Sequence, residues 1–139
     1  MDATSNVKQA VPFFWVGNME RSLRFYLDGL GFEMTLKWTP EGRVRWCRLK
    51  LGGAAVMLQE YQEGKQPAGE LGTGVSVCFM CDDALSIYRE VKARGIEAEE
   101  PFVGNGLWAI GIQDPDGYRL SFESPTGIPE ETKLSEVQF

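Results

Sequence analysis

The chain has 139 residues, 43% of them hydrophobic and 24% charged, which suits one folded domain with an ordinary core. A formal charge of −6 argues against nucleic-acid binding, and no apolar run reaches the ~20 residues of a membrane span. The sequence contains no histidine, which excludes a Ser-His or Cys-His nucleophile and removes the commonest metal ligand.

The first half of the chain alternates between strand and helix patterns. Asn18 is a suitable helix cap, Gly31 a suitable helix end, and Gly52-Gly53 a hairpin turn. The glycine-rich stretch 61–74 has no apolar period and predicts an exposed loop. The predicted strand, helix, strand and hairpin cover residues 11–17, 19–31, 32–38 and 43–61.

The second half repeats this order. A helix is expected after Asp82 or Asp83, and the Asp-Pro-Asp-Gly sequence at 114–117 predicts a tight turn. The matched features lie 62, 64 and 64 residues apart, which indicates an internal duplication. The matched pairs are Tyr26 with Tyr88, Gly31 with Gly95 and Gly53 with Gly117. The predicted strand, helix, extended segment and hairpin cover residues 75–81, 84–95, 96–102 and 107–124.

These patterns predict a single domain over residues 1–139. The start of the chain has no basic segment followed by an apolar stretch, so we expect no signal peptide and a cytoplasmic location. The tail lies outside both repeats and is expected to be mobile. The expected parts are module one at about 8–62, a loop at 62–74, module two at about 75–125 and the tail at 126–139.

The three cysteines, Cys47, Cys78 and Cys81, are expected to be reduced, because an odd count without a signal peptide favours free thiols. Cys78 and Cys81 form a C-x-x-C motif, which is typical of redox or zinc chemistry. Their segment predicts a strand, however, and residues three apart on a strand point to opposite faces. We therefore interpret them as buried thiols.

Two stretches carry a family resemblance. VGNMERSLRFYLDGLGFE at 16–33 and DPDGYRLSFE at 114–123, in a tandem βαβββ layout, resemble the vicinal oxygen chelate superfamily. That superfamily contains glyoxalase I, bleomycin resistance proteins and extradiol dioxygenases, and the resemblance covers about residues 8–125. It implies an α+β fold whose tandem βαβββ modules form a curled mixed sheet, or cup, with helices on the outer face. The cup is often completed across a homodimer.

The resemblance also locates a metal site. In metal-dependent members, four inward positions hold His, Glu or Gln and bind one divalent ion. By resemblance these positions correspond to Val11, Met57, Ser76 and Ser121 of this chain. None of the four is a good ligand for a divalent ion, and shifting the register by one residue supplies none. We therefore expect no metal and no cofactor.

The resemblance implies that these four positions point into the cup, and with them inward, alternation along the strands predicts an aromatic and apolar cup face with a few polar groups. Packing in the core or a dimer interface is the alternative for the rings, and the favoured one for Trp38, Trp46 and Trp108. Arg119 and Glu123 are either a solvated pair, which we favour, or binding groups for a carboxylate and a cation. The predicted ligand-binding residues are Phe13, Trp15, Met57, Gln59, Ser76, Cys78, Trp108, Arg119, Ser121 and Glu123.

Three functions fit the sequence. The favoured one is a metal-free homodimer that sequesters a flat or cationic small molecule, such as an antibiotic, with no nucleic-acid or membrane partner. The second is a glyoxalase-like lyase, isomerase or dioxygenase-related enzyme with an atypical or metal-free site, for which Glu60, Glu123 and Tyr118 are the acid–base candidates. The third is a regulatory or structural protein without a small ligand. The sequence leaves enzymatic activity open and favours binding.

Overall fold

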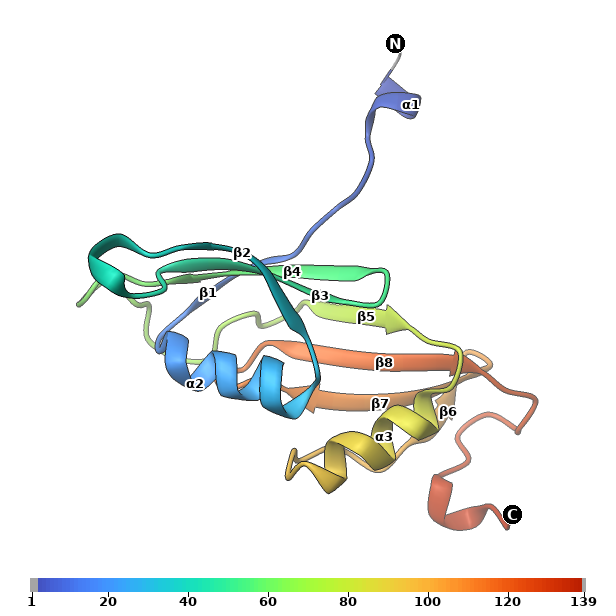
Figure 1. The fold of residues 1–139 in the computed structure, drawn as a ribbon. Coiled ribbons are helices and arrows are strands. Elements are labelled where there is room, and N and C mark those ends of the chain that lie inside the picture. The colour runs from blue at the N-terminus through green and yellow to red at the C-terminus, as the bar shows by residue number, and fades with distance from the viewer. Residues whose placement is uncertain (1–2, 139) are drawn as a thin grey trace.

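Two mixed four-stranded sheets built on the same plan form the body of the chain (Figure 1). The computed structural model describes residues 3–138. The first sheet has the order β1-β4-β3-β2 and the second β5-β8-β7-β6. In each sheet the first two strands of that order are parallel and the other neighbours antiparallel. The strands are β1 (Phe13–Val16), β2 (Glu33–Trp38), β3 (Trp46–Leu51), β4 (Ala54–Glu60), β5 (Ser76–Met80), β6 (Phe102–Gly104), β7 (Leu107–Gln113) and β8 (Arg119–Pro125).

One helix follows the first strand of each sheet, so the predicted α+β fold of two βαβββ modules is confirmed. Among residues 3–138, no helix is long and apolar enough to cross a membrane. The helices are α1 (Ala3–Asn6), α2 (Met19–Leu23), the π-helix η1 (Arg24–Gly29) that continues α2, the 3-10 helix η2 (Pro40–Gly42), α3 (Ala84–Ala93) and the 3-10 helix η3 (Leu134–Glu136).

The two main helices begin with the same pair of contacts. The side chains of Asn18 and Asp83 each accept the N–H three residues further on, at 3.0 and 3.1 Å. Glu60 and Ser124, at equivalent places near the ends of β4 and β8, each accept the N–H of the first helical residue, at 2.7 and 2.8 Å. Together these contacts satisfy N–H groups that a helix start leaves without internal partners.

Module one contains one more helical residue than module two. The caps Asn18 and Asp83 lie 65 positions apart, whereas the glycines Gly31 and Gly95 lie 64 apart. The π-helix Arg24–Gly29 accommodates the additional residue, because its hydrogen bonds enclose one residue more than those of an α-helix.

The π-helix changes one of the predicted matches. Counted from the caps, the counterpart of Tyr26 is Val91, and both side chains are buried, at 0% and 1% exposure. Tyr88, which the sequence matched to Tyr26, is half-buried. That match is wrong because Tyr26 lies eight residues after its cap Asn18, whereas Tyr88 lies only five residues after its cap Asp83.

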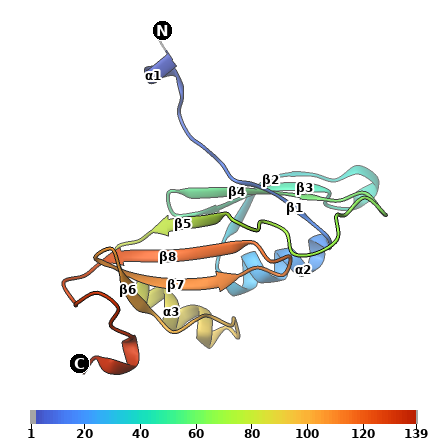
Figure 2. The same cartoon turned by 180° about the vertical axis from the view of Figure 1, so that it is seen from behind.

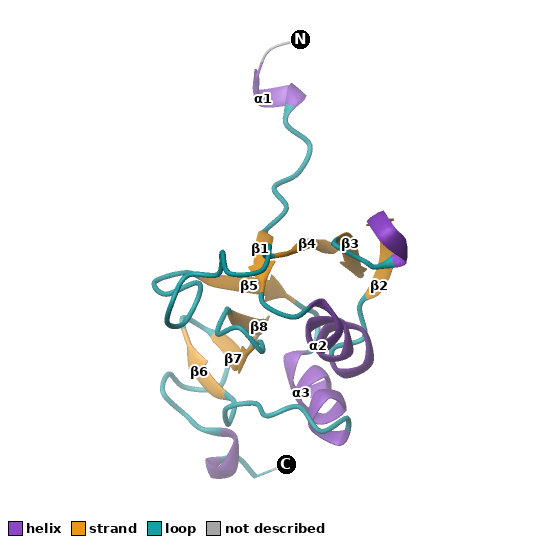
Figure 3. Ribbon diagram, turned by 90° about the vertical axis from the view of Figure 1, so that its left-hand side faces the viewer, coloured by secondary structure: helices purple, strands orange, loops and turns teal. Residues whose placement is uncertain are grey.

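The inner faces of both sheets share one core. Figure 3 shows α2 and α3 within the angle between the two sheets. Phe32 of module one and Phe79 of module two meet there, with ring centroids 6.0 Å apart. Phe14 and Phe122 contribute to the same cluster of buried side chains. The opposite faces of the two sheets therefore point outward, away from the helices and from each other.

The two ends of the chain behave differently. The described residues before Gln9 extend away from the body (Figure 2), whereas the Gln9 side chain and the Pro12 carbonyl accept hydrogen bonds from β3 and β4. The described part of the tail packs against the second module instead: the Leu134 N–H donates to the Pro101 carbonyl at 2.9 Å, and Leu134 and Val137 contact the core. This differs from the expected mobile tail, because Leu134 and Val137 place two apolar side chains against buried surface.

Candidate functional site

The outer face of the first sheet is aromatic. The register pairs Trp15 with Gln59, Gln59 with Trp46, and Trp46 with Trp38. Residues opposite each other on paired strands share a face, so this row places three indole rings across the four strands. The adjacent row is Phe13, Met57, Arg48 and Leu36. We call the six apolar members of these rows the aromatic face: Phe13, Trp15, Leu36, Trp38, Trp46 and Met57.

The aromatic face is open to solvent. Phe13 and Trp15 are 42% and 41% exposed, and Leu36 and Trp38 are 56% and 54% exposed. A contiguous group of exposed large apolar side chains marks a binding or interaction surface in a folded protein. The aromatic face is therefore the strongest candidate for a functional site in this sheet.

The outer face of the second sheet is polar. Ser121 donates its hydroxyl to the Glu123 carboxylate at 3.1 Å, and burial together with the charge of Glu123 raises the pKa of the Cys78 thiol. The Glu99 carboxylate also lies over this sheet, 2.7 Å from where a Cβ at Gly111 would stand. We call this surface the polar face, and its side chains on β5 and β8 are Ser76, Cys78, Met80, Arg119, Ser121 and Glu123.

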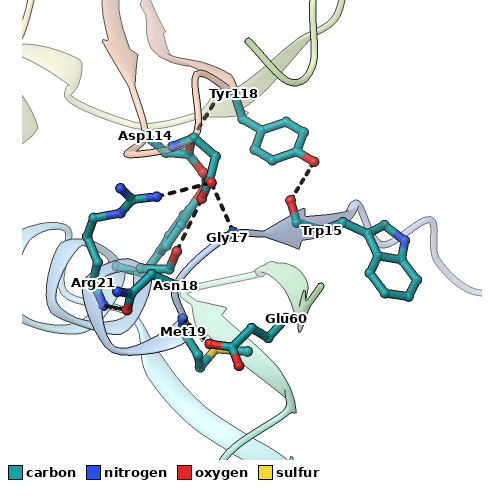
Figure 4. Close-up of polar contacts among 11 residues, drawn as sticks. Trp15, Gly17, Asn18, Met19, Arg21, Glu60, Asp114 and Tyr118 are labelled. Carbon is teal, nitrogen blue, oxygen red and sulfur yellow. Dashed lines mark hydrogen bonds and ion pairs between the residues drawn. The ribbon is translucent and has the colours of Figure 1, made fainter. Parts of the chain in front are cut away.

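Tyr118 holds the strand that carries Trp15 (Figure 4). Its hydroxyl donates to the Trp15 carbonyl at 2.8 Å, and its ring stacks on Phe14 with centroids 4.3 Å apart. Burial raises the pKa of Tyr118 to about 12, so the hydroxyl stays protonated at neutral pH. Tyr118 therefore positions Trp15, and its protonated state does not suit the general base considered from the sequence.

The predicted Asp-Pro-Asp-Gly turn lies at the boundary between the modules. Asp116 accepts the Gly17 N–H at 3.0 Å and pairs with the Arg21 guanidinium at 3.2 Å. Asp114 accepts the Tyr26 hydroxyl at 2.8 Å, and burial raises the pKa of its carboxyl group. We call Asp114 and Asp116 the latch, because they connect the last hairpin to α2 and its continuation η1.

At the opposite end of this boundary, the described part of the chain has no side-chain hydrogen bond or ion pair of this kind. There the Gly52-Gly53 turn of module one approaches Cys81 and Asp82 at the start of α3, in the position that matches the latch. Two glycines offer no side chains to fill the space, and a cavity of about 700 Å³ lies between the turn and the helix.

Glu60 faces the helices and not the aromatic face. Burial opposes its ionisation, but the Met19 N–H and the guanidinium groups of Arg43 and Arg45 outweigh this effect and hold the pKa of Glu60 below its usual range. Its carboxylate is fully engaged at the start of α2. Glu60 is therefore a structural residue and not the acid–base group considered from the sequence.

The four family metal positions do not offer metal ligands. Met57 lies on the aromatic face, Ser76 and Ser121 lie on the polar face, and Val11 precedes β1. Within residues 3–138, no three His, Cys, Asp or Glu side chains come close enough together to hold a metal ion. A thioether, a valine and two hydroxyl groups do not match the donors that zinc, nickel, iron or manganese require.

The structure divides the predicted site residues between the two faces. Phe13, Trp15, Met57 and Gln59 lie on the outer face of the first sheet. Ser76, Cys78, Arg119, Ser121 and Glu123 lie on the polar face. Trp108 differs: it stands opposite Ser124 on the inner side of its sheet and is only 5% exposed. Trp108 is a core residue, so its inclusion in the predicted site is corrected.

The predicted set left out Leu36 and Arg48, which share the outer face of the first sheet. Trp38 and Trp46 lie on the same face, although packing or an interface was favoured for them from the sequence. The length of the turn between β3 and β4 indicates from the sequence which residues of β3 share this face. Because Gly52 and Gly53 form a two-residue turn, each residue of β3 has a fixed partner on β4, and this register sets Trp46 opposite Gln59.

The prediction of buried thiols concerned Cys78 and Cys81. Cys81 is half-buried just beyond β5, and Cys47, which was outside that prediction, is buried, at 0% exposure. Cys78 is exposed on the polar face, so the expectation of a buried thiol is wrong there. β5 is the edge strand of its sheet, and in the described chain nothing covers the outer side of that edge at Cys78.

Comparison with known proteins agrees with this architecture. Residues 8–122 match the model of the Glyoxalase/Bleomycin resistance protein/Dioxygenase superfamily. A lactoylglutathione lyase of Neisseria meningitidis is 30% identical over 114 residues, which cover 77% of this chain and 83% of that protein.

Solved structures of other proteins share the fold, and two of them are antibiotic-related. A bleomycin-binding protein complexed with bleomycin is similar with a TM-score of 0.67 and 23% identity, over 86% of this chain and 100% of that one. TnmS3, an antibiotic-binding protein from Streptomyces sp. CB03234, is similar with a TM-score of 0.64 and 19% identity, over 86% and 98%. The family match, together with the two βαβββ modules, shows that this chain belongs to the glyoxalase/bleomycin resistance protein/dioxygenase superfamily.

Proposed function

We propose that this protein binds a flat small molecule, such as an antibiotic, on its aromatic face and sequesters it without a metal ion. The observation that carries the proposal is the row of Trp15, Trp46 and Trp38 across the outer face of the first sheet. Indole rings offer large flat surfaces on which planar ligands stack. The antibiotic-binding proteins of the same fold support this choice of ligand.

We propose further that the binding cup forms between two copies of the chain. The aromatic and polar faces point away from each other, so one chain does not enclose a ligand between them. In a homodimer, the polar face of one copy covers the aromatic face of the other. The exposure of Phe13, Trp15 and Trp38 supports this arrangement, because burying such side chains favours association.

The side chains at the family metal positions are the reason for proposing that no metal ion is bound. Met57, Ser76, Ser121 and Val11 stand at the family metal positions, and none supplies a nitrogen or carboxylate ligand. Glu60 is already held by Arg43, Arg45 and the start of α2. Elemental analysis of the purified protein is expected to find no stoichiometric nickel, zinc, iron or manganese, and finding one would overturn this part.

Binding is tested by calorimetry and tryptophan fluorescence with a panel of flat antibiotics. At least one compound is expected to bind, and Trp38→Ala is expected to weaken it at least about fivefold, the equivalent of roughly 1 kcal/mol of ring contact. Tyr88→Ala removes a ring from α3, away from both faces, and is the matched control. Light scattering is expected to show a dimer. Unchanged affinity in Trp38→Ala would refute binding on the aromatic face.

The second candidate is an enzyme related to the lactoylglutathione lyases, favoured by the 30% identity to the Neisseria meningitidis protein. Such an activity would have to use the polar face, where Glu123, Ser121 and Cys78 are adjacent. A lactoylglutathione lyase assay with each of the four metals separates the candidates. Turnover that depends on Glu123 would replace the binding proposal.

A further inference from the structure

We propose that the ligand carries an anionic group on its aromatic ring system, and that Arg48 binds this group. This inference rests on the proposed function and names the chemical class of the ligand. It assigns a specificity role to a residue that neither the metal positions nor the predicted site included.

Arg48 lies within the aromatic face. It stands between Met57 and Leu36 in one row of the sheet, and Trp46 precedes it by two positions on the same side of β3. Two residues along a strand span about 7 Å, so a guanidinium group lies within one ring width of the indole row. A ligand stacked on that row places a substituent beside Arg48.

The charge of Arg48 is not compensated by the described part of the chain. Within residues 3–138 the only polar contact of the Arg48 side chain is a hydrogen bond from Nη2 to the Gln9 side-chain oxygen at 3.3 Å, and no carboxylate there forms an ion pair with it. Lys50, two residues further along, stands opposite Glu33, whose charge offsets its own. The outer face of the first sheet therefore presents one net positive charge, at Arg48.

A hollow at the end of the indole row also combines aromatic rings with a positive charge. It has a volume of about 470 Å³ and is lined by Trp15, Tyr61, Gln59 and Lys65. The Trp15 and Tyr61 rings lie 5.4 Å apart, centroid to centroid. Glu60 is the only acid among the described residues that line the hollow, and it is paired with Arg43 and Arg45. Lys65 lines the same hollow and has no ion pair within those residues.

A guanidinium group recognises an oxyanion through paired hydrogen bonds, and aromatic surroundings strengthen the attraction by excluding water. The formal charge of −6 does not outweigh this, because charges beyond about 8 Å are largely screened at physiological ionic strength. On the polar face, Arg119 carries one positive charge, and Glu123 and Glu99 carry one negative charge each. Arg48 is the charged group that lies among the stacking residues of the aromatic face itself, so we infer that it decides which charge the stacked ligand carries.

The test uses two probes with one ring system and opposite charges: 2-naphthoate and 2-naphthylmethylammonium. Calorimetry with the full-length protein is expected to show naphthoate binding at least about tenfold more tightly, as hydrogen bonds to a charged group imply. Arg48→Gln keeps a donor for Gln9 and is expected to abolish the preference. Arg89→Gln, an exposed arginine on α3 without an ion pair in the described chain, is expected to keep it. Urea unfolding of each variant checks its folding.

The outcomes separate this inference from the proposed function. Equal binding of both probes, or tighter binding of the ammonium probe, would overturn the role of Arg48 and leave stacking on the aromatic face intact. A naphthoate preference that survives in Arg48→Gln would also overturn it. Binding of neither probe would refute both the inference and the aromatic binding surface.

Discussion

Removing the Tyr26 hydroxyl tests the latch at its most buried contact. Tyr26 is 0% exposed and donates to Asp114, whose carboxyl group is also buried. Burial raises the pKa of Asp114 in the folded protein, and the Tyr26 hydrogen bond opposes that rise. Tyr26→Phe leaves the ring in place and takes away the donor, so the buried carboxylate loses one of its partners.

The expected loss of stability depends on pH. A hydrogen bond to a charged group contributes about 1.5–3 kcal/mol and a neutral one about 1 kcal/mol. Because the folded pKa of Asp114 lies above its unfolded value, this residue favours folding in acid, and that advantage is lost as the pH rises through the folded pKa. Tyr26→Phe raises the folded pKa further, so it is expected to cost about 2–3 kcal/mol at pH 7 but only about 1 kcal/mol near pH 4.

Urea unfolding at the two pH values measures this difference. Tyr88→Phe is the matched control, because the Tyr88 hydroxyl has no hydrogen bond within the described residues and its ring only faces Lys92, at 5.5 Å. That variant is expected to change stability by less than about 0.5 kcal/mol at both pH values. A Tyr26→Phe loss that is the same at pH 4 and pH 7 would refute the assignment of an ionised partner.

Asp116→Ala is expected to lower the free energy of unfolding by about 2–3 kcal/mol in urea titrations, because it removes a buried acceptor from Gly17 and Arg21. A loss below about 1 kcal/mol would show that the latch contributes little. Ellman's reagent at pH 8 is expected to modify the exposed Cys78 in the folded protein but to reach Cys47 only in urea, since burial raises the pKa of Cys47 to about 11. Equal reaction rates for the two thiols would contradict their different exposure.

Local structure was predictable because it depends on neighbours in sequence. The strand period of two put Phe13 and Trp15 on one face and Phe14 on the opposite face, which packs against the helices, and the structure shows the same division. The caps Asn18 and Asp83 mark the helix starts for an equally local reason, since each side chain reaches only three residues ahead.

Contacts between distant segments were not predictable from those patterns. The sequence indicated the turn at 114–117, but not that Asp116 would accept a hydrogen bond from Gly17, 99 residues earlier. Trp108 was wrongly included among the ligand-binding residues. The loop between β7 and β8 has five residues, and the register of the two strands that it joins does not follow from composition. In both cases tertiary packing decides the position of the side chain.

The two ends of the boundary between the modules differ in their contacts. Asp114 and Asp116 pin one end, while the other end, at Gly52-Gly53, adjoins a cavity of about 700 Å³. The two modules are therefore held together by their shared core and by these hydrogen bonds at one end of the boundary. Because the aromatic and polar faces belong to different modules, the same contacts fix the angle between the two faces that form the cup in the proposed dimer.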